Sequence, residues 1–214
     1  MKKLIFGSAL LILSITVHCQ GQAAQSTDNI QILPEKGDFS VGVDMVPIFK
    51  IIFGTGEDSD IIPSVNFKAM LSDKTALRTE IAINRASASS EDSDISAISS
   101  SYGFAIGPEW RTGNSRVQGY LGFMGAFLYS NYKFVDINED EPLEASPSYG
   151  GALRFFLGAE CFVAPKFAIG SQVAWGPVYT RMTEKYDGLE ESSISGFAIG
   201  ADNITGALIL SYYF

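Results

Sequence analysis

Apolar residues recur at every second position through most of the chain from residue 37 onward, and helical spacing is largely absent. Period two is the repeat of a β-strand, because successive side chains point to opposite faces of a sheet. The pattern predicts a single all-β domain whose strands begin near Phe39, Ile61, Leu77, Tyr102, Val117, Leu153, Phe167 and Ile204. The strand over residues 117–132 carries large apolar residues on both faces, so its orientation stays open.

The connections between these strands alternate in length. Those near Asp73, Gly113 and Pro165 are short, whereas four others, around Gly56, Asp92, Glu139 and Glu190, are long and polar. Short turns at one end and long loops at the other are typical of barrels in the outer membrane, with the turns periplasmic and the loops extracellular. Three short turns and four long loops predict eight antiparallel strands. Residues 195–203 fit either an extension of the last strand or a loop.

The first residues have the features of a secretory signal. Lys2 and Lys3 precede an apolar stretch over residues 4–17, which is too short for a good membrane-spanning helix. We therefore expect a signal peptide over residues 1–21, with cleavage between residues 21 and 24. A short periplasmic segment over residues 22–36 and the barrel over residues 37–214 would follow. Lipid modification of Cys19 is a weaker alternative, because His18 places a bulky ring beside it.

Composition agrees with an exported protein of many strands. Hydrophobic residues make up 46% of the chain and charged residues 18%, and there are 21 glycines. Without Lys2 and Lys3 the chain keeps 13 basic residues against 24 acidic ones. This negative charge argues against nucleic acid as a partner.

The chain ends with apolar or aromatic residues at alternate positions, namely Leu208, Leu210, Tyr212 and Phe214. This ending resembles the C-terminal signal that the barrel-assembly machinery recognises in outer-membrane barrels. With the leader and the loop alternation, it makes nearly the whole mature chain similar to small OmpX-like barrels and to the transmembrane part of OmpA-type proteins. The resemblance implies a closed antiparallel transmembrane β-barrel in the Gram-negative outer membrane. It also implies outer-membrane lipid, lipopolysaccharide and the assembly machinery as partners, and no periplasmic peptidoglycan-binding domain.

Charged residues recur on the strand face opposite the apolar one, so we expect them to face the lumen. Four are acidic and four are basic: Asp44, Glu80, Glu109 and Glu160, with Lys68, Arg78, Arg111 and Arg154. A charge removed from water is costly unless it is paired, and the interior of an eight-stranded barrel is filled by side chains. The pattern therefore predicts a structural network of ion pairs in the lumen. A gated path for ions or protons is the alternative.

Outward aromatic residues gather toward both predicted ends of the strands, which is typical of the two interfaces of a membrane. The periplasmic group is Trp110, Phe167, Tyr212 and Phe214, and the opposite group is Tyr102, Tyr129, Tyr149, Trp175 and Tyr179. Cross-strand pairs in a soluble sandwich are the alternative explanation.

The sequence gives little indication of an enzyme. The only histidine, His18, lies in the leader, so the mature chain lacks the base that activates a nucleophile or water in outer-membrane hydrolases. A pair of carboxylates acting as a glycosidase dyad stays open. Residues 136–140 have the acidic character of a calcium loop, but the required glycine and terminal glutamate spacing are missing. We expect no enzyme, no cofactor and no metal site.

The sequence therefore favours a non-enzymatic outer-membrane barrel with a structural, envelope-integrity or surface-interaction role through its acidic extracellular loops. Divalent ions that bridge these loops to lipopolysaccharide are a minor alternative. A narrow transport barrel for small or hydrophobic solutes is the second hypothesis. A soluble, lipocalin-like binder in the periplasm is the third. The pattern does not identify a partner for the loops.

Overall fold

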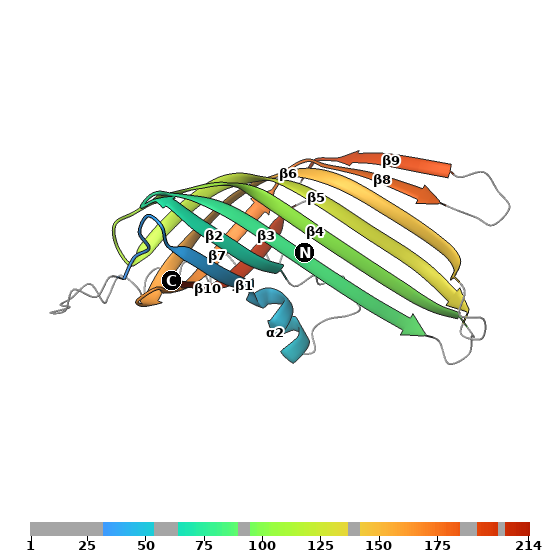
Figure 1. Cartoon of the computed structure of the whole chain (residues 1–214), viewed down its shortest axis with the longest axis horizontal. Coiled ribbons are helices and arrows are strands. Elements are labelled where there is room, and N and C mark those ends of the chain that lie inside the picture. Colours follow the sequence, from blue (N-terminus) through green and yellow to red (C-terminus); the bar gives the residue numbers. More distant parts are fainter. Residues whose placement is uncertain (1–31, 54–63, 90–94, 137–141, 185–191, 201–203) are drawn as a thin grey trace.

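The computed structural model describes residues 32–53, 64–89, 95–136, 142–184, 192–200 and 204–214 (Figure 1). The predicted signal peptide and the middle of each predicted long loop lie outside these residues. In chain order the elements are β1 (Phe39–Asp44), α2 (Met45–Phe53), β2 (Ser64–Ser72), β3 (Thr75–Ser89), β4 (Ile95–Thr112), β5 (Val117–Asp136), β6 (Pro142–Ala164), β7 (Phe167–Trp175), β8 (Val178–Glu184), β9 (Ser192–Ala198) and β10 (Thr205–Tyr213).

Eight of these strands close into a ring. Each pairs antiparallel with the next in the order β1-β2-β3-β4-β5-β6-β7-β10, and β10 returns to β1. The three predicted short turns join β2 to β3, β4 to β5, and β6 to β7. The strands are inclined to the long axis of the molecule, as closure of a barrel requires (Figure 1). The prediction of a closed antiparallel barrel of eight strands is confirmed.

The remaining two strands, β8 and β9, continue the barrel wall beyond its closed part. Phe155 pairs with Trp175 and Ala152 with Val178, so β8 continues the register of β7 along β6 across the interruption at Gly176 and Pro177. β9 pairs with β8 and forms the outer edge of this extension. Figure 1 shows these two strands above β6, projecting away from the closed part of the barrel. Part of the stretch 195–203, left open by the sequence, is therefore strand.

The wall is short on the opposite side, where β1 has only six residues and a helix follows it directly. β1 ends at Asp44, whose Oδ1 accepts a hydrogen bond from the backbone N–H of Val46 at 3.0 Å. This is the geometry of an N-terminal helix cap, and Pro47 is compatible with a first helical turn. α2 packs against β10. Within the described residues, no helix is both long and apolar enough to cross a membrane.

Side chains along the strands alternate between two very different environments. Outward apolar residues are exposed, for example Ile83 at 59% and Leu157 at 56%, whereas inward Arg78 and Met124 are fully buried. The orientation of β5 is now clear, because Leu121, Phe123 and Phe127 point outward. A protein surface this apolar is compatible with lipid rather than with water.

Aromatic rings cover part of the outer wall in two rows. Tyr102, Tyr129 and Tyr149, here called the tyrosine row, stack across β4, β5 and β6 with centroid separations of 6.2 and 6.4 Å. A second row runs from Trp110 through Phe123 and Phe155 to Trp175. The two tryptophans, predicted at opposite rims, are therefore the two ends of one continuous row across inclined strands.

An N-terminal strap, residues 32–37, packs at the end of the barrel where the short turns lie. Ile32 and Leu33 contact buried residues of the lumen, and the Ile32 carbonyl accepts a hydrogen bond from the backbone N–H of Lys166 at 3.3 Å. Lys166 has a positive φ of 62°, which directs its backbone N–H to the strap and its carbonyl to the N–H of Tyr213. The strap thus ties the β6–β7 turn to this end of the barrel.

An ion pair between Lys166 and Asp38 reinforces this attachment. Partial burial opposes ionisation of Asp38, but hydrogen bonds from Lys166 Nζ and from the backbone N–H of Glu35 outweigh it. The pKa of the Asp38 carboxyl consequently lies below its usual range. This contribution to stability is present above the ordinary pKa of an aspartate and is lost as the pH falls through the lowered value.

Because the apolar face points outward, an arginine introduced on it should destabilise the barrel most near the middle of the bilayer. Phe155→Arg places a cation on the apolar band and should lower the free energy of unfolding by about 2–4 kcal/mol near the bilayer midplane. Ser100→Arg, outward but beyond the tyrosine row, should cost at most about 1 kcal/mol. Urea unfolding in lipid vesicles measures both. Equal small effects would contradict the assigned faces.

Candidate functional site

The lumen contains a cluster of five charged side chains, here called the charge layer. Its members come from four strands: Lys68 from β2, Arg78 from β3, Glu109 and Arg111 from β4, and Glu160 from β6. Each is at most 5% exposed. Their inward orientation follows from the alternation of each strand, since their sequence neighbours face outward.

Glu160 makes the closest contacts in the charge layer. Its carboxylate accepts a hydrogen bond from Lys68 Nζ at 2.5 Å, another from Arg111 Nη2, and a third from the hydroxyl of Tyr213 at 2.8 Å. Arg111 Nη1 also donates to the Tyr213 hydroxyl, at 2.6 Å. Three donors on one carboxylate offset much of the cost of removing it from water.

Glu109 interacts with the same cations at longer range. Its oxygens lie 3.4 Å from Lys68 Nζ, 3.5 Å from Arg78 Nη1 and 3.7 Å from Arg111 Nη1. No residue in the described part of the chain donates a hydrogen bond to this carboxylate. Glu109 therefore contributes mainly charge to the cluster.

Neutral side chains complete the coordination of Arg78. Asn66 Oδ1 accepts hydrogen bonds from Arg78 Nε and Nη2 at 3.1 and 2.6 Å, and Gln172 Oε1 accepts one from Nη1 at 2.5 Å. The predicted lumen network contained only charged residues, so it did not include Asn66, Gln172 or Tyr213. Strand parity alone places all three side chains inward, and this signal could have added them to the network.

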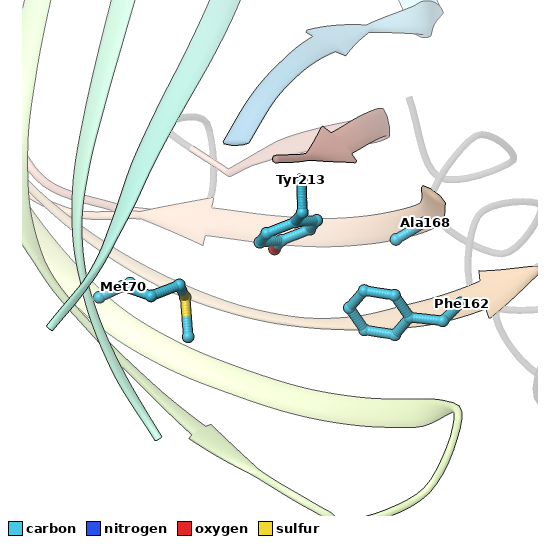
Figure 2. Packing of buried hydrophobic residues seen from close by; sticks show 5 residues of the cluster. Met70, Phe162, Ala168 and Tyr213 are labelled. Atoms are coloured by element: carbon cyan, nitrogen blue, oxygen red, sulfur yellow. The ribbon is translucent and has the colours of Figure 1, made fainter. Parts of the chain in front are cut away.

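Apolar layers lie on both sides of the charge layer. Toward the short turns, the lower layer contains Met70, Ala76, Phe162, Ala168 and Tyr213, and the strap residues Ile32 and Leu33 pack against it (Figure 2). Toward the long loops, the upper layer contains Ala105, Tyr120, Met124, Phe156 and Ala174. With the strap added below, the lumen is filled by side chains over three successive layers, as expected for eight strands.

Aromatic faces of both layers contact the buried cations. Lys68 Nζ lies 4.8 Å from the centre of the Tyr120 ring, and the Arg78 guanidinium lies 4.9 Å from that of Phe156. The Arg111 guanidinium lies 5.9 Å from the centre of the Phe162 ring. Such contacts attract a cation through the negative face of the ring and contribute most where water is excluded.

The other three predicted lumen residues do not join this cluster in the same way. Glu80 and Arg154 form a separate ion pair of 3.0 Å nearer the long loops, with side chains 12% and 27% exposed. The structure gives Asp44 a different role, because its Oδ1 caps α2 and also accepts from the Leu208 N–H at 3.3 Å. The physical reason is that β1 ends there, so the carboxylate meets free backbone N–H groups.

Beyond the upper layer, inward side chains become accessible again. Along β5, the inward positions change from Met124, which is fully buried, to Leu128, which is 39% exposed. The inward-facing residues of β6 at this level are small, including Gly150 and Ala152. Among the described residues, inward side chains are therefore more exposed toward the long loops than toward the short turns.

The remaining sequence predictions concern the last strand and metal sites. Leu208, Leu210, Tyr212 and Phe214 occupy the outward face of β10 and its end, and Phe214 stacks on Phe39 at a centroid distance of 6.5 Å. Within the described residues, no group of three or more His, Cys, Asp or Glu side chains is arranged to hold a metal ion.

Comparisons with known proteins are informative at the level of fold. No protein-family model matches the chain, and no curated protein sequence does. Among solved structures, the outer membrane protein OprG from Pseudomonas aeruginosa is similar over 86% of this chain and 99% of its own, with 12% identity and a TM-score of 0.52. The chain has the fold of a small outer-membrane β-barrel.

Two further barrels align with lower scores. Ail, the attachment invasion locus protein of Yersinia pestis, aligns over 84% of this chain and 99% of its own with 11% identity and a TM-score of 0.43. A major outer membrane protein from Thermus thermophilus aligns over 83% and 98% with 11% identity and a TM-score of 0.45.

The difference in burial between Glu160 and Glu80 predicts that neutralising them destabilises the barrel to very different extents. Glu160→Gln removes the charge that Lys68 and Arg111 share and should lower the free energy of unfolding by about 3–5 kcal/mol. Glu80→Gln, which breaks the partly exposed pair with Arg154, should cost about 1 kcal/mol or less. Urea unfolding of both variants in the same vesicles is the measurement. Similar losses at the two positions would show that water screens the charge layer.

Proposed function

We propose that this protein is a non-conducting, non-enzymatic barrel of the Gram-negative outer membrane, with a structural or surface-interaction role at its extracellular end. The observation that carries the proposal is the lumen filled by the charge layer between its two apolar layers. A continuous water column has no path through fully buried Arg78, Met124 and Phe162. Function is then left to the outer wall and to the end with the long, acidic loops.

The outer wall supports membrane insertion. Its apolar residues are exposed on every barrel strand, and the tyrosine row lies toward their loop end. This arrangement is that of a lipid-facing band with an aromatic girdle at one edge. A soluble binding barrel would instead place its apolar face inside and its charges outside, the reverse of what Leu157 and Arg78 do.

A narrow transport barrel for small or hydrophobic solutes is the second candidate. The accessible Leu128 on the inner wall favours it, since a solute could enter from the side of the long loops. Passage would require the charge layer and the N-terminal strap to move together. Their hydrogen bonds and ion pairs oppose that movement.

Conductance separates these two candidates. The purified, folded barrel should show no sustained current in planar bilayers, because side chains occupy the lumen. An open porin in the same bilayers serves as the positive control, and heat-modifiable migration in gels verifies folding. Reproducible current steps, or swelling of liposomes in small solutes, would favour transport instead.

The proposed assembly signal predicts that Phe214 matters more for outer-membrane assembly than Phe39, the ring on which it stacks. Phe214→Gln should reduce the amount of barrel in the outer membrane and increase the amount in the periplasm, because Phe214 ends the alternating strand. Phe39→Gln breaks the same stack from the other strand and serves as the matched control. Fractionation and heat-modifiable migration measure both. Equal assembly of the two variants would leave only a packing role for Phe214.

A further inference from the structure

The outer wall changes character just beyond the apolar band on three strands. On β3 the outward position after Ile83 is Arg85, and on β8 the outward position after Tyr179 is Arg181. On β5, Lys133 occupies the same face as Tyr129, four residues further along. Arg85 and Arg181 are exposed and Lys133 is half-buried. Together these three residues are here called the basic rim.

The basic rim lies next to the tyrosine row. Arg181 is directly opposite Tyr149 in the pairing of β6 with β8. Ile83 pairs with Tyr102, so Arg85 lies one outward position beyond that row. Because tyrosines prefer the level of lipid headgroups, the three cations are placed at that level or slightly beyond it.

The charge of the basic rim opposes that of the chain, whose formal net charge is −9. Among residues whose side chains the structure describes, no Asp or Glu occupies an outward position of β3, β5 or β8 beyond the tyrosine row. Within the same residues, none of the three cations forms an ion pair, and Arg181 donates one exposed hydrogen bond of 3.4 Å to Ser193 Oγ. The rim is thus a set of outward cations available to an external anion.

We propose that Arg85, Lys133 and Arg181 bind the phosphate groups of a phosphorylated lipid in the leaflet that surrounds the loop end of the barrel. Guanidinium groups bind phosphate oxygens in pairs, and an ammonium binds them as a point charge. Side chains that point sideways from the wall meet a lipid headgroup before they meet a soluble partner of the loops. This inference rests on the proposed insertion in the outer membrane and names a ligand for its outer wall.

Proteoliposomes of full-length mature barrel in phosphatidylcholine test the proposal. Diphosphorylated lipid A is added to the outer leaflet, from the side of the long loops, and the urea midpoint of unfolding is compared with that after adding its dephosphorylated analogue. The phosphorylated lipid should raise the midpoint of the wild type, and added salt should reduce the rise. The triple variant should lose most of the rise: Arg85→Gln, Lys133→Gln and Arg181→Gln.

A matched control removes three charges from the other end of the barrel, where the added lipid is absent: Lys36→Gln, Lys74→Gln and Arg116→Gln. This control should keep the full rise. An unchanged rise in the basic-rim triple, or an equal loss in both triples, overturns the proposal. An equal rise with inorganic phosphate assigns the rim to free phosphate and overturns the lipid assignment.

Two further measurements keep the result interpretable. If the basic-rim triple inserts poorly, the single variants Arg85→Gln and Arg181→Gln should each lose part of the rise, and full retention in both overturns the proposal. Conductance of the same vesicles tests the proposed function separately. A conducting barrel that keeps its phosphate preference would contradict only the closed-lumen function.

Discussion

A barrel of eight strands leaves no room for bulk water in its centre, so charges that point inward must be satisfied by one another. Glu160 meets this constraint with three donors, of which Lys68 and Arg111 are cations. The charge layer contains three cations and two carboxylates, and aromatic faces at 4.8 to 5.9 Å contact all three cations. The positive excess is therefore distributed over π-faces as well as over carboxylates.

Room for these large side chains comes from small residues on neighbouring strands. A Cβ added at Gly158 would lie 2.4 Å from the Tyr120 ring, and one at Gly122 would lie 2.4 Å from the ring of Phe156. Inward glycines thus determine where the upper apolar layer can form. The same alternation that buries Arg78 exposes Leu77 and Ile81 on the other side, so the closed lumen and the lipid-facing wall arise from one sequence pattern.

The strands and their faces could be predicted because period two is a local property of the chain. The pairing of charged side chains within the lumen could not be predicted, because it depends on the register across four strands. Glu160 is 92 residues from Lys68, and parity alone gives both an inward direction without a height. Asp44 shows a similar limit. Its position in the alternation predicts an inward side chain, but β1 ends at this residue, so the carboxylate caps α2 instead. The signal that could have corrected it was Asp followed by Pro three residues later, which favours a helix start.

The barrel wall is taller on one side than on the other because the paired strands differ in length and register. Val178 of β8 pairs with Ala198 of β9, and Ala174 of β7 pairs with Thr205 of β10. These two pairs are four residues apart on the β7–β8 side and seven residues apart on the β9–β10 side. The outward positions are therefore odd-numbered in β9 and even-numbered in β10, as Phe197 and Tyr212 show. Across the barrel, β1 ends after six residues and α2 follows it. The barrel is therefore closed where all eight strands are paired, around the charge layer, and its taller side, formed by β3 to β6 with β8 and β9, carries the basic rim toward the loops.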